Sequence, residues 1–320
     1  MDLQNKMHTP KLTICVPTHN RGEFLEAWFE ENFEAINDKR IKILIHDNGS
    51  SDTTPEVVKK YKNVLHNIHH IRTDVATNFD NSVLRCVDEV ETDYFWPIGD
   101  TYLISKELVS RLLLILSEHC SHNAIIFNIN KRYKGIGRVF ENYDELLSNV
   151  AGVNACLATT VYRTNKKPLN LKRFIGYGYI HSAILFEESF GREVSVLMIS
   201  DLSIEVIRRK GLKKRSWAYS RKSLEIVTND WNSHLKSLSG YDPHVHRGVS
   251  SAVGEITRLF SMRGVMLMRS TNAVRPSSLK LITSNVPFKF AKMFYVYVLI
   301  SLIFPKIILY LMLNLKERIS

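Results

Sequence analysis

The chain has 320 residues, of which 45% are apolar and 23% charged, and these values are typical of a globular protein with a full hydrophobic core. Its net charge of +11 favours an anionic partner, such as a nucleotide or sugar diphosphate, nucleic acid or an acidic membrane surface. The four cysteines lack CxxC spacing and the N-terminus lacks an apolar segment, which excludes a zinc motif or disulfide framework, predicts no signal peptide and favours a reducing, cytosolic setting.

Apolar runs that end in polar turns alternate with amphipathic helical patterns over the first 130 residues. Strands are expected at 12–16, 41–45, 66–71, 94–96 and 124–127. Helices are expected between them, near 24–36, 55–61, 78–90 and 106–116. Strands alternating with helices predict an α/β fold with a doubly wound, mostly parallel sheet.

Beyond residue 130 the alternation weakens. An apolar helix is expected at 182–190, followed by two short strands between 193 and 207. Glu187 and Glu188 lie on that helix and are expected to be exposed. The basic run at 208–215 is either a solvated loop or a contact for an anion, such as a diphosphate or lipid headgroups. Helical patterning returns from 231 to 268.

The C-terminal stretch 294–315 is almost wholly apolar, with interruptions at Pro305 and Lys306 and basic residues on both sides. A helix that spans a bilayer needs about 20 apolar residues, and a central lysine costs roughly 2.5–3.5 kcal/mol. The stretch therefore predicts two short helices at a membrane interface, with a spanning helix or a buried core helix as alternatives. The flanking positive charge fits a cytoplasmic leaflet.

Polar segments follow three of the expected strands: Pro17–Arg21, Asp47–Asp52 and Gly99–Asp100. Because the carboxyl ends of parallel strands meet at one edge of a sheet, these segments should converge there. Asp47 can accept a hydrogen bond from a nucleobase or ribose, and Asp100 can bind a divalent ion that bridges phosphates. A single Asp after a strand is more often a helix cap, so the prediction rests on three such segments in series. The Walker A and GxGxxG motifs are absent.

Together, Cys15–Arg21, His46–Asp52, Asn78–Asp80 and Gly99–Asp100 resemble the nucleotide-sugar half of family-2 glycosyltransferases with the GT-A fold. The resemblance covers about residues 11 to 130 and is nearest to abequosyltransferase-like bacterial enzymes of O-antigen and capsule assembly. It implies inverting transfer of a sugar from a nucleotide-sugar to a growing, often lipid-linked glycan. It also implies a set of donor-binding residues: Pro17, Thr18, His19, Asn20 and Arg21 along the nucleotide, Asp47 and Asn48 at the base, Asn78, Asp80 and Asn81 near the sugar, and Gly99 and Asp100 near the diphosphate.

The sequence departs from this family at the metal site. Asp100 matches the first Asp of the metal-binding DxD motif, which implies Mg²⁺ or Mn²⁺, but Tyr102 stands where the second carboxylate is usual. Three alternatives follow. Asp100 and diphosphate oxygens hold the ion weakly, basic residues replace the ion, or the activity has been lost.

An inverting mechanism also needs a base for the acceptor hydroxyl. The acidic pair that often supplies it is absent, and Gly176–Ser182 stands in its place. His181 is a candidate by position and by its usual pKa range, with a capping or packing role as the alternative. Asp230 is a second candidate. The adjacent Trp231 either stacks on a sugar or anchors the fold.

The leading hypothesis is a membrane-associated glycosyltransferase at the cytoplasmic face of the inner membrane, with a nucleotide-sugar donor and a glycan or lipid-linked acceptor. The alternatives are a nucleotidyltransferase, whose glycine-rich signature is missing, and a catalytically silent nucleotide-sugar-binding protein. A nucleic-acid partner is disfavoured, because no aromatic-basic motif appears. The expected division is a nucleotide-sugar-binding half at 1–130, an acceptor-side half of the same catalytic domain at 131–230, a helical region at 231–285 and membrane-associating helices at 286–320.

Overall fold

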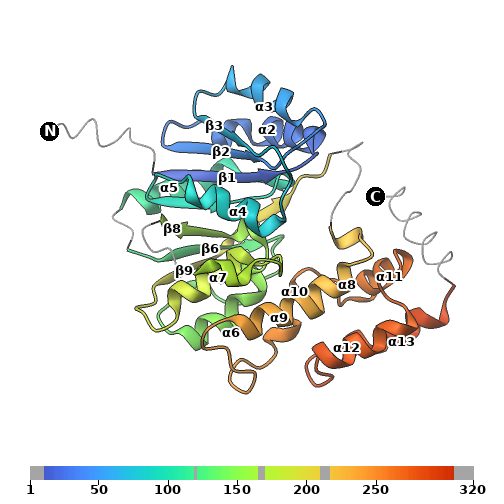
Figure 1. The fold of residues 1–320 in the computed structure, drawn as a ribbon. Coiled ribbons are helices and arrows are strands. Elements are labelled where there is room, and N and C mark those ends of the chain that lie inside the picture. The colour runs from blue at the N-terminus through green and yellow to red at the C-terminus, as the bar shows by residue number, and fades with distance from the viewer. Residues whose placement is uncertain (1–10, 119–120, 165–169, 210–216, 306–320) are drawn as a thin grey trace. The chain divides into compact units, whose positions relative to one another are not determined.

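A computed structural model describes residues 11–118, 121–164, 170–209 and 217–305. The chain divides into two compact units. The first comprises Met1–Leu146 and Val153–Leu212, and the second comprises Leu147–Gly152 and Lys213–Ser320. The first unit is built on a nine-stranded sheet, and the elements described in the second unit are helices (Figure 1).

The sheet has the order β3-β2-β1-β4-β8-β6-β9-β5, and β7 pairs with β9. Strands β1 to β4 are mutually parallel. Because β8 is antiparallel to both β4 and β6, β6 and its parallel partner β9 run in the same direction as the first four strands. The strands are β1 (Leu12–Thr18), β2 (Ile41–Asp47), β3 (Ile68–Arg72), β4 (Tyr94–Pro97), β5 (Tyr102–Leu103), β6 (Ala124–Ile129), β7 (Arg138–Phe140), β8 (Thr160–Arg163) and β9 (Val196–Val206).

The predicted α/β fold with a mostly parallel sheet is confirmed, and each of the five expected strands is present. The inner strands β1 and β2 are mostly apolar: Ile14, Val16, Ile43 and Ile45 are fully buried, and each such side chain stabilises the fold by roughly 1.5–3 kcal/mol. The antiparallel strand β8 was not predicted. It inserts between β4 and β6.

Two groups of helices pack around this sheet. Helix α2 packs on α3 and α5, whereas α4 packs on α7 and on β1, β2 and β4. The helices of the first part of the chain are α2 (Gly22–Ile36), α3 (Thr54–Lys62), α4 (Phe79–Asp88), α5 (Lys106–Ser117), α6 (Tyr143–Asn154) and α7 (Ile180–Ser189). Helix α2 buries Phe24, Leu25, Trp28, Phe29 and Ile36, whereas Phe33 at the same helical spacing is half-buried.

The strand order reverses between β1 and β4. The chain runs outward from β1 to β2 and β3, then returns through α4 to place β4 on the other side of β1. In open α/β sheets, ligands bind outside the carboxyl ends of the strands at such a reversal. The segments that follow β1 and β4 therefore flank the expected ligand position.

The expectation of two short strands between 193 and 207 was wrong. One strand, β9, covers Val196–Val206, and its register against β6 jumps from Phe127–Ile199 to Asn128–Ser203. The residues between Ile199 and Ser203 form a bulge in β9. The bulge includes the polar pair Ser200–Asp201, which resembles a turn in the sequence.

The second unit contains helices α8 (Ser223–Glu225), η5 (Ile226–Asp230), α9 (Trp231–Ser237), α10 (Val249–Ile256), α11 (Met262–Ser270), α12 (Leu279–Asn285) and α13 (Lys292–Ile303). Helix α13 packs on α11 and buries Phe294, whose ring stacks on Phe260 with centroids 3.9 Å apart. None of the described helices is both long enough and apolar enough to cross a membrane. Residues 306–320 of the predicted tail lie outside the described part of the chain.

Asn32 connects helix α2 to the segment after Asp100. Its side chain is fully buried, its amide donates to the Trp28 carbonyl (2.8 Å) and the Tyr102 carbonyl (3.1 Å), and its oxygen accepts from the Ile104 N–H (2.6 Å). Buried backbone groups need such partners, since an unpaired one loses its hydration without compensation. Asn32 therefore fixes the backbone on which Asp100 and Tyr102 are carried.

We expect Asn32→Ala to lower the free energy of unfolding by about 2–4 kcal/mol, because it leaves buried backbone groups near Tyr102 and Ile104 unpaired. Urea denaturation followed by circular dichroism measures this change. Glu34→Ala, at an exposed position of the same helix, is the control and should change stability by less than about 0.5 kcal/mol. Equal effects of the two substitutions would contradict the role of Asn32.

Candidate functional site

The three polar segments meet at the carboxyl edge of the sheet, as their positions after parallel strands predict. Thr18, at the end of β1, is the register partner of Asp47 at the end of β2. The Thr18 hydroxyl donates to an Asp100 carboxylate oxygen (3.0 Å), and Arg21 Nε lies 2.8 Å and 2.7 Å from the two carboxylate oxygens. Residues of the first and third segments thus form one cluster at the strand-order reversal.

The first and second segments are joined by short hydrogen bonds. The Asn20 N–H donates to the Ser50 hydroxyl (2.8 Å), and the Asn20 side-chain oxygen accepts from the Ser51 N–H (2.7 Å). The His19 ring lies 2.8 Å from the Asn48 carbonyl through Nδ1. Asp52 accepts from the Gly22 N–H at 3.0 Å, which ties the start of α2 to the same turn.

The turn after Asp47 requires glycine at position 49. Gly49 has φ of +70°, and a Cβ there would lie 2.8 Å from the Ala76 nitrogen, so a larger residue would clash as well as be strained. The neighbouring Asn48 bonds Thr77 three times, with its amide donating to the Thr77 carbonyl (2.9 Å) and its oxygen accepting from the N–H (2.9 Å) and the hydroxyl (3.0 Å). The turn thereby holds the segment that leads to Asn78.

Asp47 is fully buried and keeps one acceptor open. Its Oδ1 accepts from the Ser50 N–H at 2.8 Å. Its Oδ2 has no hydrogen-bond partner among the described residues, and Arg72 Nε is 3.6 Å away. A buried carboxylate oxygen that accepts no hydrogen bond is costly unless a ligand completes it. A role for Arg72 was not predicted from the sequence, although this residue directly follows an expected strand and therefore lies at the same edge of the sheet.

The carboxylate of Asp100 is buried and neutralised by Arg21. Burial raises the pKa of Asp100, while the Arg21 charge and the hydrogen bonds from Arg21 and Thr18 oppose that rise. The Arg21 guanidinium also lies 4.0 Å from the centre of the Phe24 ring. The pair is therefore a fixed structural element of the site.

This arrangement does not fit a resident divalent ion at Asp100. Both oxygens of the carboxylate already face a guanidinium, and a cation placed there would be next to a like charge. Burial raises the pKa of Tyr102, so its phenol stays neutral and supplies no anionic ligand. Among the described residues, no group of three or more His, Cys, Asp and Glu side chains is arranged to hold a metal.

Asp80 connects the start of α4 to the start of α7. Its carboxylate is almost fully buried and accepts from the backbone N–H groups of Gly176 (2.7 Å), Gly178 (2.9 Å) and Ile180 (3.2 Å). Asn78 caps α4 by accepting from the Asn81 N–H at 2.9 Å. Of the residues expected near the donor sugar, Asp80 is thus engaged with backbone, while Asn78 is exposed and Asn81 half-buried.

His181 lies next to this contact, in the interior. Its Nε2 is 3.1 Å from the Ala155 carbonyl, its own carbonyl accepts from the Tyr162 hydroxyl (2.8 Å), and its ring meets Phe79 edge-on. Burial lowers the pKa of His181 to about 4, and only backbone hydrogen bonds oppose this. The residue is therefore neutral at physiological pH, in surroundings that suit the packing role named as its alternative.

The other residues singled out in the second half of the sequence have different environments. Asp230 belongs to the second unit, where it is half-buried and burial raises its pKa. Trp231 is fully buried and donates to the Val249 carbonyl at 2.8 Å, so it anchors the fold. The expected exposure of Glu188 was wrong: it is 7% exposed, and it pairs with Arg192, which follows the end of α7. Most of the basic run, residues 210–215, lies outside the described part of the chain.

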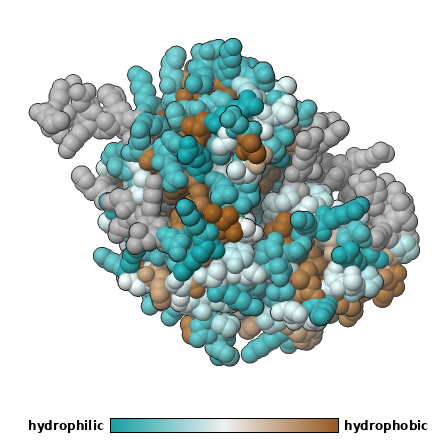
Figure 2. Space-filling model, in the orientation of Figure 1, coloured by the Kyte–Doolittle hydropathy of each residue, from teal (hydrophilic) through white to brown (hydrophobic). Residues whose placement is uncertain are grey.

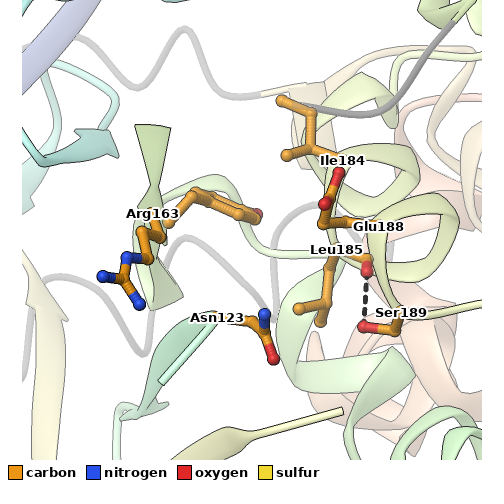
Figure 3. Close-up of a pocket in the computed structure, with 7 residues that line it drawn as sticks. Asn123, Arg163, Ile184, Leu185, Glu188 and Ser189 are labelled. Carbon is orange, nitrogen blue, oxygen red and sulfur yellow. Dashed lines mark hydrogen bonds between the residues drawn. The ribbon is translucent and has the colours of Figure 1, made fainter. Parts of the chain in front are cut away.

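Two cavities lie away from the strand edge. One, between α7 and the β6–β8 region, is lined by Asn123, Arg163 and Glu188 among others, and its volume of about 10 Å³ suits a single water (Figure 3). The other, in the second unit, has a volume of about 300 Å³ and is lined in part by Tyr241, His246 and Phe290. The first is too small for a sugar, and the lining residues given for the second include none of the predicted site residues, so the strand-edge cluster remains the candidate site.

The lowered pKa of His181 makes a testable contribution to stability. Above pH 6.5 both the folded and the unfolded states hold a neutral ring; below it the unfolded state gains a proton first, so stability falls as the pH falls toward 4. We expect His181 to account for about 2 kcal/mol of the stability lost between pH 7 and pH 5.

Urea unfolding at a series of pH values tests this expectation. His181→Gln should flatten the pH dependence of the unfolding free energy over this interval, even if it lowers stability overall. His244→Gln, at an exposed position, should leave the slope unchanged. A variant at position 181 with the wild-type slope would show that the ring does not titrate in this way.

Comparisons with known proteins place the fold. TarS of S. aureus (residues 1–349, in complex with UDP-GlcNAc) has a TM-score of 0.53 at 15% identity, covering 85% of this chain and 78% of that one. The mannosyltransferase PcManGT of Pyrobaculum calidifontis, in complex with GDP-Man and Mn²⁺, has a TM-score of 0.54 at 12% identity, covering 92% and 86%. These similarities confirm the GT-A fold.

Comparison of the sequence with protein-family models identifies the family as well as the fold. No curated protein matches the chain. The model of the family described as glycosyl transferase family 2 matches residues 13–183, which is more than half of the chain and includes the strands and polar segments of the site. This protein therefore belongs to glycosyl transferase family 2.

Proposed function

We propose that this chain is an inverting glycosyltransferase that moves a sugar from a nucleotide-sugar to a lipid-linked glycan in bacterial surface polysaccharide synthesis. The observation that carries the donor part is the open Oδ2 of Asp47, buried at the end of β2 beside the Thr18–Arg21–Asp100 cluster. An acceptor-only carboxylate in this position suits the N–H of a base or the hydroxyl of a ribose.

Two further observations support a nucleotide-sugar donor. The strand-edge cluster lies at the strand-order reversal, where α/β sheets bind nucleotides. The structures of TarS and PcManGT contain UDP-GlcNAc and GDP-Man, respectively, on the same fold. Family membership favours glycosyl transfer over the nucleotidyl transfer that the sequence left open.

The proposal of a lipid-linked acceptor rests on helix α13, which exposes apolar side chains. One face of this helix packs inward through Phe294 and Val298, while Met293, Leu299 and Ile303 on other faces are exposed. Apolar residues reach the surface over the C-terminal helices, at the lower right of Figure 2. Exposed apolar residues next to lysines such as Lys289 and Lys292 suit a helix lying in an anionic membrane interface. A peripheral position at the cytoplasmic face of the inner membrane would bring the enzyme to an acceptor such as an O-antigen or capsule intermediate.

The abequosyltransferase-like subgroup and the catalytic base are further proposals. His181 and Asp230 are the two candidate bases, and the low pKa of His181 makes it the weaker one. A catalytically silent protein is the competing function. It would bind the donor without turnover or hydrolysis, so release of the nucleotide in the presence of an acceptor extract separates the two.

Donor binding should depend on Asp47. We expect calorimetry with UDP-, GDP-, CDP- and dTDP-sugars to show one preferred nucleotide class. Asp47→Asn should weaken its binding by about 10- to 100-fold, because a hydrogen bond to a charged acceptor is lost or reversed. Asp74→Asn, at an exposed position of the same unit, should bind like wild type. Absence of binding to every donor by folded protein would refute the donor site.

Membrane binding should depend on the exposed side of α13. We expect the full chain to sediment with vesicles containing phosphatidylglycerol, and Leu299→Gln with Ile303→Gln to weaken vesicle affinity at least about 100-fold, since each apolar side chain contributes roughly 1.5–3 kcal/mol when buried. Leu114→Gln, an equally exposed leucine on α5, should have no effect. If wild type stays in the supernatant, the membrane proposal fails while the donor proposal stands.

A further inference from the structure

The guanidinium of Arg21 is only partly used by the protein. Its Nε contacts both oxygens of Asp100, whereas its two terminal nitrogens have no hydrogen-bond partner among the described residues. The Arg21 side chain is 21% exposed and that of Asp100 only 6%. The carboxylate thus lies beneath the guanidinium, and the unused N–H groups belong to the more exposed partner.

We propose that Arg21 binds the diphosphate of the donor directly and takes the place of the divalent ion that PcManGT holds in its complex. This inference rests on the proposed function and deepens it, because it says how the anionic part of the donor is recognised. A guanidinium offers paired N–H donors with the spacing of phosphate oxygens, and it keeps its charge at every physiological pH.

The surroundings of Arg21 hold it in place before a donor arrives. Its Nε donates to Asp100, its guanidinium carbon lies 4.0 Å from the centre of the Phe24 ring, and its backbone N–H donates to the Thr54 hydroxyl at 3.1 Å. Thr18 fixes the Asp100 carboxylate from the other side. A donor group held in this way loses little conformational freedom when it binds a ligand.

The same contacts explain why Asp100 is present although Tyr102 replaces the second carboxylate. A lone carboxylate beside a neutral phenol is a poor site for a divalent ion, which prefers several anionic or carbonyl oxygens. Beneath a guanidinium, the same carboxylate neutralises and orients it. Asp100 is then a positioning residue for Arg21.

Calorimetry on the full chain, with a nucleoside diphosphate and its parent nucleoside as probes, tests this inference. The ratio of their affinities measures recognition of the diphosphate alone, since the base and ribose are common to both. We expect this ratio in wild type to change by less than about threefold between EDTA and Mn²⁺ buffers, and Arg21→Gln to reduce it about 10- to 100-fold without changing nucleoside affinity.

Three variants make the result interpretable. Arg21→Gln combined with Asp100→Asn removes both charges of the buried pair, so we expect it to fold even if the single Arg21 variant does not, and to show the same reduced ratio. Asp100→Asn alone keeps a hydrogen-bond acceptor under Arg21 and should retain most of the ratio in EDTA. Arg111→Gln, which removes an exposed arginine paired with Asp201, should behave like wild type.

Each outcome has a distinct meaning. A ratio that appears only with Mn²⁺, or one that persists after Arg21 is replaced in both variants, overturns the role of Arg21 and leaves the proposed function intact. Failure of wild type to bind any nucleoside diphosphate in either buffer instead refutes the proposed function itself.

Discussion

Two buried carboxylates at the ends of parallel strands are the constraint around which the site is built. Asp47 and Asp100 lie in the interior at the carboxyl edge, where an uncompensated charge would be strongly destabilising. Each has an arginine as its cation, Arg72 and Arg21, respectively. The turns, helix caps and hydrogen bonds of the surrounding segments hold these pairs in place, so the features that stabilise this edge also fix the geometry of the candidate site.

Much of this could be predicted from local sequence. Strands β1, β2 and β4 are short apolar runs that end in polar turns, and their convergence follows from the rule that parallel strands share an edge. What could not be predicted depends on distant partners. The four residues Thr160–Arg163 show no pattern that would place them between β4 and β6. The pairing of Arg21 with Asp100 depends on strand order, which the sequence does not state.

Asp80 is a second residue whose partners could not be predicted from local sequence. The residue was expected near the donor sugar, because it falls in a motif that the resemblance identifies. Its partners in the structure are backbone N–H groups of Gly176, Gly178 and Ile180, and no side chain marks them in the sequence. His181 follows directly after these groups, is buried, and meets the ring of Phe79 on α4 edge-on. Local patterns predicted that the segments after β1, β2 and β4 share one edge of the sheet, but they did not predict the contacts of single residues within them.

The Asp80 contact also bears on the order in which the protein can fold during synthesis. The carboxylate and its three donors are 96 to 100 residues apart, and β8, which closes one side of β4, also comes late in the chain. At 5–20 residues per second, a ribosome needs roughly 5–20 s to make the intervening chain. During that time β1 to β4 can pair, but Asp80 must stay hydrated, and the start of α4 lacks its hydrogen bonds to the segment that begins α7. Strands β1 to β4 and helix α4 therefore reach their final state only after residues 160–180 have been made.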